Sequence, residues 1–311
     1  MTYLSLENVR KVYDEKVAVN DLSLQVPKGV ILGIIGPNGA GKTTTIRMVM
    51  NITAPDSGSV LFEGRKIDES FKNRVGYLPE ERGLYKKMTL EEIILYMAQL
   101  KDCPRAVAQT RIAPWLERMG LSDYRLKKVE ELSKGMQQKL QFITTILHDP
   151  DIIILDELFS GLDPVNMELM KGVVQDLKRS GKTILFSTHV MEQAEKLCDH
   201  ICMISGGNKV IDGTMAEVKA RFGKNSVQIV IDGDGSFIRT LPGVKSVMEF
   251  GTYHELKLVE GADTQVILRS LIERVNLYRF EVVEPSLYDI FIDMAKVNPA
   301  EMTQDAVEAN V

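Results

Sequence analysis

A glycine-rich stretch at residues 36–43, GPNGAGKT, has the residue types and the spacing that bind phosphate. It fits the pattern G-x-x-x-x-G-K-[ST], in which glycines let the backbone turn tightly and direct successive N–H groups at phosphate oxygens. Lys42 can reach the β- and γ-phosphates of a nucleoside triphosphate, and the Thr43 hydroxyl can bind Mg²⁺. The stretch therefore predicts a nucleoside triphosphate site. The residues assigned to it are Gly36, Pro37, Asn38, Gly39, Ala40, Gly41, Lys42, Thr43 and Thr44.

Two adjacent carboxylates, Asp156 and Glu157, follow the apolar run IIIL at residues 152–155. The run predicts a central buried strand, and open α/β sheets bind their ligands at the carboxyl ends of such strands. Unpaired charges at a buried position are costly, which favours a functional pair over a surface turn. With a phosphate loop upstream, Asp156 suits the Mg²⁺ shell and Glu157 suits a general base that polarises water.

Three weaker signals leave a structural and a functional interpretation open. Tyr13, in the segment KVYDEK, is expected in a loop between two strands, where it could stack on a purine or simply pack. Ser133 and Gly135 stand at a helix entrance, which can present N–H groups to an anion, although a capping serine is the ordinary explanation. His189 follows an apolar run at residues 182–187 and could point into the same crevice as the acids, or be a structural histidine.

The elements that must position these residues follow from hydrophobic periodicity. Alternating apolar and polar residues predict half-buried antiparallel strands at residues 2–9 and 17–26. Short apolar runs predict buried parallel strands at residues 29–35, 75–80, 152–155 and 182–187. Apolar residues at helical spacing predict helices at residues 44–50, 136–148 and 165–179. The predicted fold class is therefore α/β.

The middle of the chain is expected to be helical, whereas both of its flanks are mixed. Thr89 and Glu92 have the capping-box spacing that begins a helix. Residues 104–120 continue helically around Pro114. We therefore expect a helical subdomain at about residues 86–150, inserted into a nucleotide-binding domain of residues 1–222.

Residues 223–297 are expected to form a second, smaller domain. The order of its predicted elements is β-α-β-β-α-β plus a helix, which is typical of a ferredoxin-like α+β domain. It contains no cysteine, a single histidine (His254) and no glycine-rich loop, so a regulatory or dimerisation role is favoured over catalysis. Residues 298–311 are acidic and lack aromatic side chains, and we expect a disordered tail.

Composition limits the setting and the partners. The chain has 311 residues, 44% of them hydrophobic and 26% charged, as in ordinary globular proteins. A net charge of −5 provides no general attraction to nucleic acid, and we expect no nucleic acid partner. No apolar run approaches the ~20 residues of a membrane span. The three cysteines, Cys103, Cys198 and Cys202, form no C-x-x-C pair, which favours buried thiols in a reducing cytosol.

The order of these motifs closely resembles the ATP-binding subunit of an ABC transporter. The phosphate loop is followed by a helical insertion, LSKGM at 132–136, IIILDE at 152–157, SGLD at 160–163 and a strand that ends near His189. The resemblance covers about residues 2–222 and implies a P-loop core with an antiparallel β subdomain. The C-terminal part looks, more loosely, like the accessory domain of bacterial efflux-type ABC ATPases for sodium or drugs.

This resemblance implies roles that the local patterns leave open. Tyr13 matches the aromatic residue that stacks on adenine. Ser133 and Gly135 match the signature loop, which contacts the γ-phosphate of ATP held by the other protomer. Asp163 matches the loop that links the two sites, and His189 matches the switch histidine that helps to place the attacking water. Lys42, Glu157 and His189 are the catalytic residues that the resemblance implies.

The resemblance also implies a homodimer that holds ATP and Mg²⁺ between its two copies. It implies a separate transmembrane permease subunit, through which the protein would lie on the cytoplasmic, inner face of the cell membrane. ATP-driven closure of the dimer would power transport and hydrolysis of ATP would open the dimer again, with efflux as the expected direction. A non-transport ABC-type ATPase of a soluble assembly or regulatory complex remains the alternative. A GTP-binding switch is disfavoured because residues 208–211, NKVI, lack the acid of the guanine-reading N-K-x-D element.

The sequence departs from the family pattern at three places. Lys134 and Met136 replace the second glycine and the glutamine of the usual LSGGQ signature. Glu80 stands nearest to the glutamine that touches Mg²⁺ and relays to the membrane partner, and we assign it to the metal site with Thr43 and Asp156. Leu158 replaces a common proline. The residues expected for hydrolysis are present, and an active ATPase is predicted.

Overall fold

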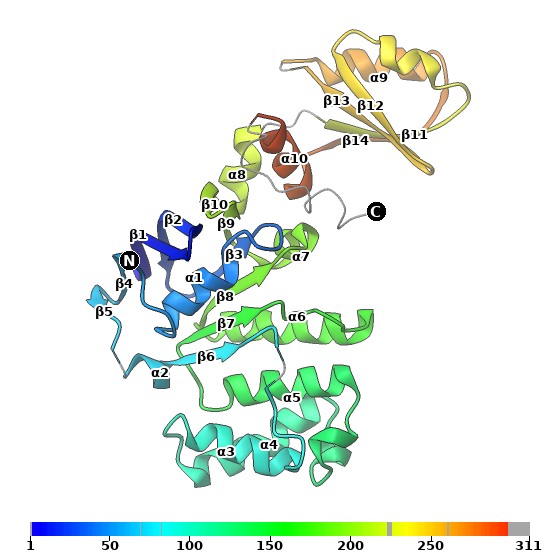
Figure 1. The fold of residues 1–311 in the computed structure, drawn as a ribbon. Coiled ribbons are helices and arrows are strands. Elements are labelled where there is room, and N and C mark those ends of the chain that lie inside the picture. Colours follow the sequence, from blue (N-terminus) through cyan, green and yellow to red (C-terminus); the bar gives the residue numbers. More distant parts are fainter. Residues whose placement is uncertain (1, 69, 82, 223–225, 260, 298–311) are drawn as a thin grey trace. The chain divides into compact units, whose positions relative to one another are not determined.

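The computed structural model describes residues 2–68, 70–81, 83–222, 226–259 and 261–297 (Figure 1). The chain divides into two compact units, of which the first ends at Thr214 and the second begins at Met215. The sequence interpretation set this boundary after residue 222, whereas the structure groups residues 215–222 with the second unit. The expected tail at residues 298–311 lies outside the described residues.

A six-stranded sheet forms the centre of the first unit, with strand order β10-β9-β3-β8-β7-β6. Its strands are β3 (Ile31–Ile35), β6 (Val75–Leu78), β7 (Ile152–Asp156), β8 (Thr183–Thr188), β9 (His200–Ser205) and β10 (Asn208–Thr214). Every residue of β3, β7 and β8 is buried, as their apolar runs predict. Neighbouring strands are parallel except for the β9–β10 hairpin, so the carboxyl ends of β3, β7 and β8 meet at one edge.

A second sheet of the first unit is antiparallel and has the order β2-β1-β4-β5. Its strands are β1 (Thr2–Tyr13), β2 (Lys16–Pro27), β4 (Ser57–Phe62) and β5 (Arg65–Lys66). The β1–β2 ladder extends beyond the predicted strands, as far as the pair Tyr13 and Lys16. The expectation that Tyr13 lies in a loop is therefore wrong, because cross-strand pairing continues up to the two-residue turn.

Helices accompany the large sheet, and three of them come from the part of the chain that connects β6 to its neighbour β7. The helices of the first unit are α1 (Lys42–Val49), α2 (Phe71–Arg74), α3 (Leu90–Gln99), α4 (Arg105–Arg118), α5 (Lys134–Ile146), α6 (Pro164–Arg179) and α7 (Met191–Leu197). Helices α3, α4 and α5 gather beyond β6, the edge strand of the sheet (Figure 1). The predicted capping box is present, since Glu92 N donates to Thr89 Oγ1 at 3.3 Å and Thr89 N donates to Glu92 Oε2 at 2.8 Å.

The helical insertion approaches the sheet closely at Gly76 in β6. A Cβ at this position would lie 2.3 Å from the backbone oxygen of Thr145 in α5, so only glycine fits. The Thr145 hydroxyl donates to the backbone oxygen of Gln141 at 2.9 Å and lies 3.4 Å from the backbone oxygen of Tyr77 in β6. Close packing of α5 on β6 therefore fixes where the insertion sits relative to the nucleotide-binding sheet.

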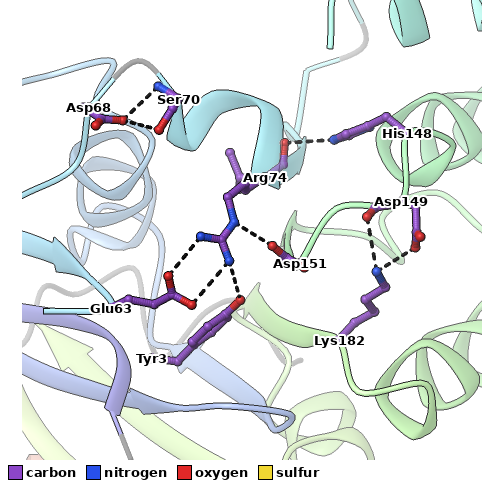
Figure 2. A network of polar contacts seen from close by, with 10 residues as sticks. Tyr3, Glu63, Asp68, Ser70, Arg74, His148, Asp149, Asp151 and Lys182 are labelled. Atoms are coloured by element: carbon purple, nitrogen blue, oxygen red, sulfur yellow. Dashed lines mark hydrogen bonds and ion pairs between the residues drawn. The ribbon is translucent and has the colours of Figure 1, made fainter. Parts of the chain in front are cut away.

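Arg74, the last residue of α2, joins three segments of the first unit (Figure 2). Its Nε donates to Asp151 Oδ2 at 2.7 Å, and its Nη1 donates to Glu63 Oε2 at 3.0 Å. Its Nη2 donates to the Tyr3 hydroxyl at 3.3 Å. The hydrogen bond to Glu63 raises the pKa of Arg74 above its usual value. Because Tyr3 lies in β1 and Asp151 precedes β7, this guanidinium ties the antiparallel sheet to the large one.

The second unit contains a four-stranded sheet of order β12-β13-β11-β14 in which all neighbours are antiparallel. Its elements are α8 (Met215–Phe222), β11 (Ser226–Asp232), β12 (Val244–Phe250), β13 (Tyr253–Leu258), α9 (Thr264–Ile272), β14 (Asn276–Val283) and α10 (Leu287–Val297). The order β-α-β-β-α-β confirms the predicted ferredoxin-like class. The first crossover is a short 3₁₀ helix, Ser236–Thr240, at the place of the short helix predicted in that order.

Two further observations concern the described residues alone. None of their helices is both long enough and apolar enough to cross a bilayer. Cys103, Cys198 and Cys202 are buried free thiols, as their spacing predicts.

We expect Arg74→Met to lower the free energy of unfolding of the first unit by about 1–2 kcal/mol, because ion pairs and a hydrogen bond are lost at a half-exposed side chain. Urea unfolding followed by the fluorescence of the single tryptophan, Trp115, measures this change. Arg179→Met is the control, since Arg179 pairs with Asp176 of its own helix at an exposed position, and it should cost less than about 0.5 kcal/mol. Equal losses in the two variants would contradict the bridging role of Arg74.

Candidate nucleotide-binding and hydrolysis site

The glycine loop connects β3 to α1 and passes close to neighbouring backbone. Gly36 and Gly41 have φ angles of 152° and 106°, which L-residues with side chains rarely adopt. A Cβ on Gly36 would lie 2.0 Å from the Ile204 oxygen, and one on Gly41 would lie 2.3 Å from the Ala18 oxygen. The loop therefore requires glycine at both positions, for the conformation and for the space.

Lys42 lies inside the curve of this loop. Its Nζ donates to the backbone oxygens of Gly36 at 2.8 Å and Pro37 at 3.0 Å, and only 6% of the residue is exposed. Burial lowers the pKa of Lys42, while the charges of Glu157, Asp156 and Glu80 act to raise it. The site thus holds one buried ammonium among three carboxylates.

Helix α1 begins at Lys42, and its first turn is free to face an anion. No side chain caps this turn, and no acid lies within it. The first N–H groups of a helix have no partner inside the helix, and they carry the positive end of its dipole. The loop and the helix start therefore provide an anion site of the kind that binds phosphate.

Asp156, the last residue of β7, is 1% exposed and lies next to the loop. The Ser187 hydroxyl donates to its Oδ1, and the Thr43 hydroxyl donates to its Oδ2 at 3.4 Å. Burial raises the pKa of Asp156, while the Ser187 hydrogen bond opposes that shift. Adjacent ligands of an octahedral Mg²⁺ lie about 3 Å apart, so the Thr43 and Asp156 oxygens fit this ion.

Glu157 and His189 are joined directly. His189 N donates to Glu157 Oε1 at 3.1 Å, and His189 Nδ1 lies 2.8 Å from the same oxygen. Glu157 has a φ angle of 50°, in the left-handed region that side chains disfavour, and Glu157 N donates to the Ser187 oxygen at 3.1 Å. Strain of this kind persists where the surroundings hold it, here between the ends of β7 and β8.

A cavity of about 440 Å³ brings most of the predicted site residues together. It is lined by Tyr13, Lys16, Ala18, Asn38, Gly39, Gly41, Lys42, Thr43, Thr44, Glu80, Asp156 and Glu157. Tyr13 is 43% exposed, so its ring can receive a base. The sequence interpretation missed Lys16 and Ala18, which the β1–β2 hairpin brings to the cavity by pairing Lys16 with Tyr13.

Ser133, Gly135 and Asp163 lie outside this cavity. Ser133 caps α5 by accepting from Met136 N at 3.3 Å, and Asp163 caps α6 by accepting from Asn166 N at 3.0 Å. The two helix starts are neighbours, since a Cβ on Gly135 would lie 3.7 Å from Leu162 Cδ2. Ser133 and Asp163 are exposed, and together they form a surface separate from the cavity.

Glu80 reaches the cavity from the segment that follows β6. Gln141 of α5 holds this segment by donating from Nε2 to the backbone oxygens of Glu81 at 3.3 Å and Pro79 at 3.5 Å. The helical insertion therefore controls the position of a carboxylate that faces the nucleotide site.

Comparison with known proteins decides the family. A family model described as ABC transporter matches residues 19–160. The chain is 43% identical over 290 residues to the uncharacterized ABC transporter ATP-binding protein YhaQ of Bacillus subtilis, and the match covers 93% of this chain and 97% of that protein. The chain belongs to the ABC transporter ATP-binding proteins. It is therefore an ATP-binding ATPase subunit that powers a transporter, and the GTP-switch alternative is excluded.

Further matches concern the C-terminal part and the whole length of this ABC subunit. A model described as the C-terminal domain of DrrA1-3-like ATP-binding proteins matches residues 213–295, which confirms the looser resemblance of the C-terminal part. The linearmycin resistance ATP-binding protein LnrL of Bacillus subtilis is 31% identical over 307 residues, covering 94% of this chain and 97% of that protein. A solved ATP-binding subunit of an ABC transporter superposes with a TM-score of 0.66 and 30% identity, over 71% of this chain and 94% of that chain.

We expect Glu157→Gln to lower the rate of ATP hydrolysis by roughly 10²–10⁴-fold, because the amide cannot accept a proton from water. ATP binding should change by less than about twofold, since the glycine loop is untouched. Phosphate release and binding of a fluorescent ATP analogue measure the two effects. The control is Glu168→Gln, an exposed acid paired with Lys171 on α6, which should hydrolyse at the wild-type rate. A Glu157→Gln variant that retains a third of the wild-type rate would rule out the base.

Proposed function

We propose that two copies of this subunit close around two ATP molecules and so drive an efflux transporter through a separate transmembrane permease. The observation that carries the proposal is the separation of the two halves of the expected site. The cavity contains the glycine loop, the acids and Tyr13, whereas Ser133 and Asp163 stand exposed on a different surface. A second copy that presents this surface to the cavity would complete the site.

The start of α5 is chemically suited to a partner's phosphate. Ser133 Oγ accepts a hydrogen bond in its capping role, which leaves its hydroxyl proton free to be donated elsewhere. The first turn of α5 contains no acid and begins with Lys134. N–H groups, a hydroxyl donor and an ammonium group together favour an anion at this surface.

The residues of the cavity, together with His189 beside it, have distinct parts in hydrolysis. Lys42 and the glycine-loop N–H groups bind and orient the triphosphate, and Tyr13 stacks on the base. Thr43 and Asp156 would hold Mg²⁺, with Glu80 close to them. The bound ion supplies positive charge that neutralises the phosphate oxygens. Glu157 accepts the proton of the attacking water, and His189 holds Glu157 Oε1.

A second cavity, of about 370 Å³, supports a separate permease partner. It lies among β6, α3 and α5, and its lining includes Tyr77, Pro79, Leu84, Met97, Leu100, Gln141 and His148. Pro79 lines this cavity, while its neighbour Glu80 lines the nucleotide cavity. A permease segment seated here would act on Glu80 through one short piece of backbone, and would hold the subunit at the inner face of the membrane.

The direction of transport is proposed from the relatives. LnrL is a resistance protein, and a Nod factor export ATP-binding protein I from Cupriavidus pinatubonensis is 39% identical over 213 residues. Efflux fits both of these names and the DrrA-like C-terminal domain.

We expect the Glu157→Gln variant to form dimers in saturating ATP and Mg²⁺, because bound nucleotide then stays intact at the interface. Light scattering after size exclusion measures the mass. Adding Ser133→Arg should prevent dimerisation, because bulk at the start of α5 blocks the approach of the second copy, while ATP binding to each monomer continues. A Glu157→Gln protein that stays monomeric, alone and with its permease, would refute the closed dimer.

We expect Leu100→Glu to abolish association with the permease, because it places a charge in the second cavity. Basal hydrolysis should stay within about twofold of wild type. The measurement is co-purification from detergent-solubilised membranes. The amount of transmembrane protein that the variant retains is compared with the amount that wild type retains. Leu126→Glu is the control, since Leu126 is 75% exposed and does not line that cavity. Equal retention in both variants would place the permease elsewhere.

A further inference from the structure

Thr188 ends β8 and lies directly behind the expected base. It is fully buried, and its hydroxyl donates to Glu157 Oε2 at 3.4 Å. Thr188 Oγ1 itself accepts from Val190 N at 3.1 Å, which sets the direction of the hydroxyl. Gln193 Oε1, on α7, lies 3.3 Å from Thr188 Oγ1 and is a second acceptor for its proton.

The two oxygens of Glu157 therefore have different supports. Oε1 is bound by the backbone N–H and the ring of His189, while Oε2 is contacted by the Thr188 hydroxyl. A carboxylate held at both oxygens cannot rotate about its last torsion, whereas one held at a single oxygen can. Small displacements of a base lower rates steeply, because proton transfer requires hydrogen-bond geometry.

We propose that Thr188 is a positioning residue for hydrolysis, whose hydroxyl fixes the orientation of Glu157. The inference rests on the proposed role of Glu157 as the base. Thr188 does not line the nucleotide cavity, so we expect it to act on turnover and not on nucleotide affinity. The competing explanation is structural, namely that the hydroxyl only stabilises the turn into α7 through Val190 and Gln193.

Thr188→Val removes the hydroxyl at nearly constant volume. We expect kcat to fall by about 10-fold, with KM for ATP changed by less than about twofold, because Glu157 loses one of its two supports. Thr188→Ser keeps the hydroxyl and should restore kcat to within about threefold of wild type. A kcat for Thr188→Val within twofold of wild type, or a loss that serine does not rescue, would overturn the proposal.

Thr183→Val is the matched control. Thr183 begins the same strand, is equally buried, and its hydroxyl accepts from Gly29 N at 2.9 Å, at the opposite end of β8. It should lose stability without losing kcat. Gln193→Leu separates the two explanations, since it leaves the Thr188 proton to Glu157 alone. The positioning role predicts a kcat no lower than wild type, and the structural role predicts the loss seen with Thr188→Val.

A readout without hydrolysis uses the ring of His189. In protein labelled with ¹⁵N-histidine, the Nδ1 signal reports its contact with Glu157 Oε1, and His189→Asn assigns it among the four histidines. Thr188→Val should shift this signal, while Thr188→Ser and Thr183→Val should not. An unchanged Nδ1 signal in Thr188→Val would overturn the proposal. This outcome would count even if the variant hydrolysed ATP slowly, because the slow rate would then have another cause, such as misfolding. If Glu157→Gln failed to stop hydrolysis, the proposed role of Glu157 as the general base would instead be refuted.

Discussion

Asp156 of β7 is the register partner of Ser187 in β8, and Ile35 of β3 is the partner of Thr188. These parallel pairings set the depth at which each strand ends, and so they place the loop after β3 beside the acids after β7. A shift of one residue would turn every side chain to the other face of the sheet. Close packing opposes such a shift, because every residue of β3, β7 and β8 is buried and would have to exchange its packing neighbours.

At the carboxyl ends of these strands, buried carboxylates outnumber the buried ammonium group. One ammonium, Lys42, lies among carboxylates in a region where Asp156 is almost fully buried. Buried charges are tolerated when they are paired or bind ions. A triphosphate and a divalent cation would supply the missing partners, the phosphates for Lys42 and the loop N–H groups, and the cation for Asp156. The buried charges therefore destabilise the site when it is empty. Binding of the triphosphate and the cation would remove this electrostatic cost.

The helical insertion adds a mechanical connection to this chemistry. Helix α5 packs on β6 at Gly76, holds the segment of Pro79 and Glu81 through Gln141, and is capped at its start by Ser133. One rigid helix thus joins the second cavity, the carboxylate of Glu80 and the surface expected to meet another copy. Movement of α5 would displace residues at all three places, because packed elements move as units rather than deforming continuously.

The sequence alone determined the glycine loop, the acids at residues 156–157, the α/β class, the capping box at Thr89 and the family, because each depends on local pattern or motif order. Only the tertiary structure decided that Ser187 and Thr188 hold those acids, that Arg74 joins three segments, that Tyr13 ends a strand and that residues 215–222 belong to the second unit. These facts depend on strand register and on contacts between residues far apart in the chain, such as Thr188 and Glu157. Hydrophobic periodicity predicts which face a side chain occupies, but not which neighbour it meets there.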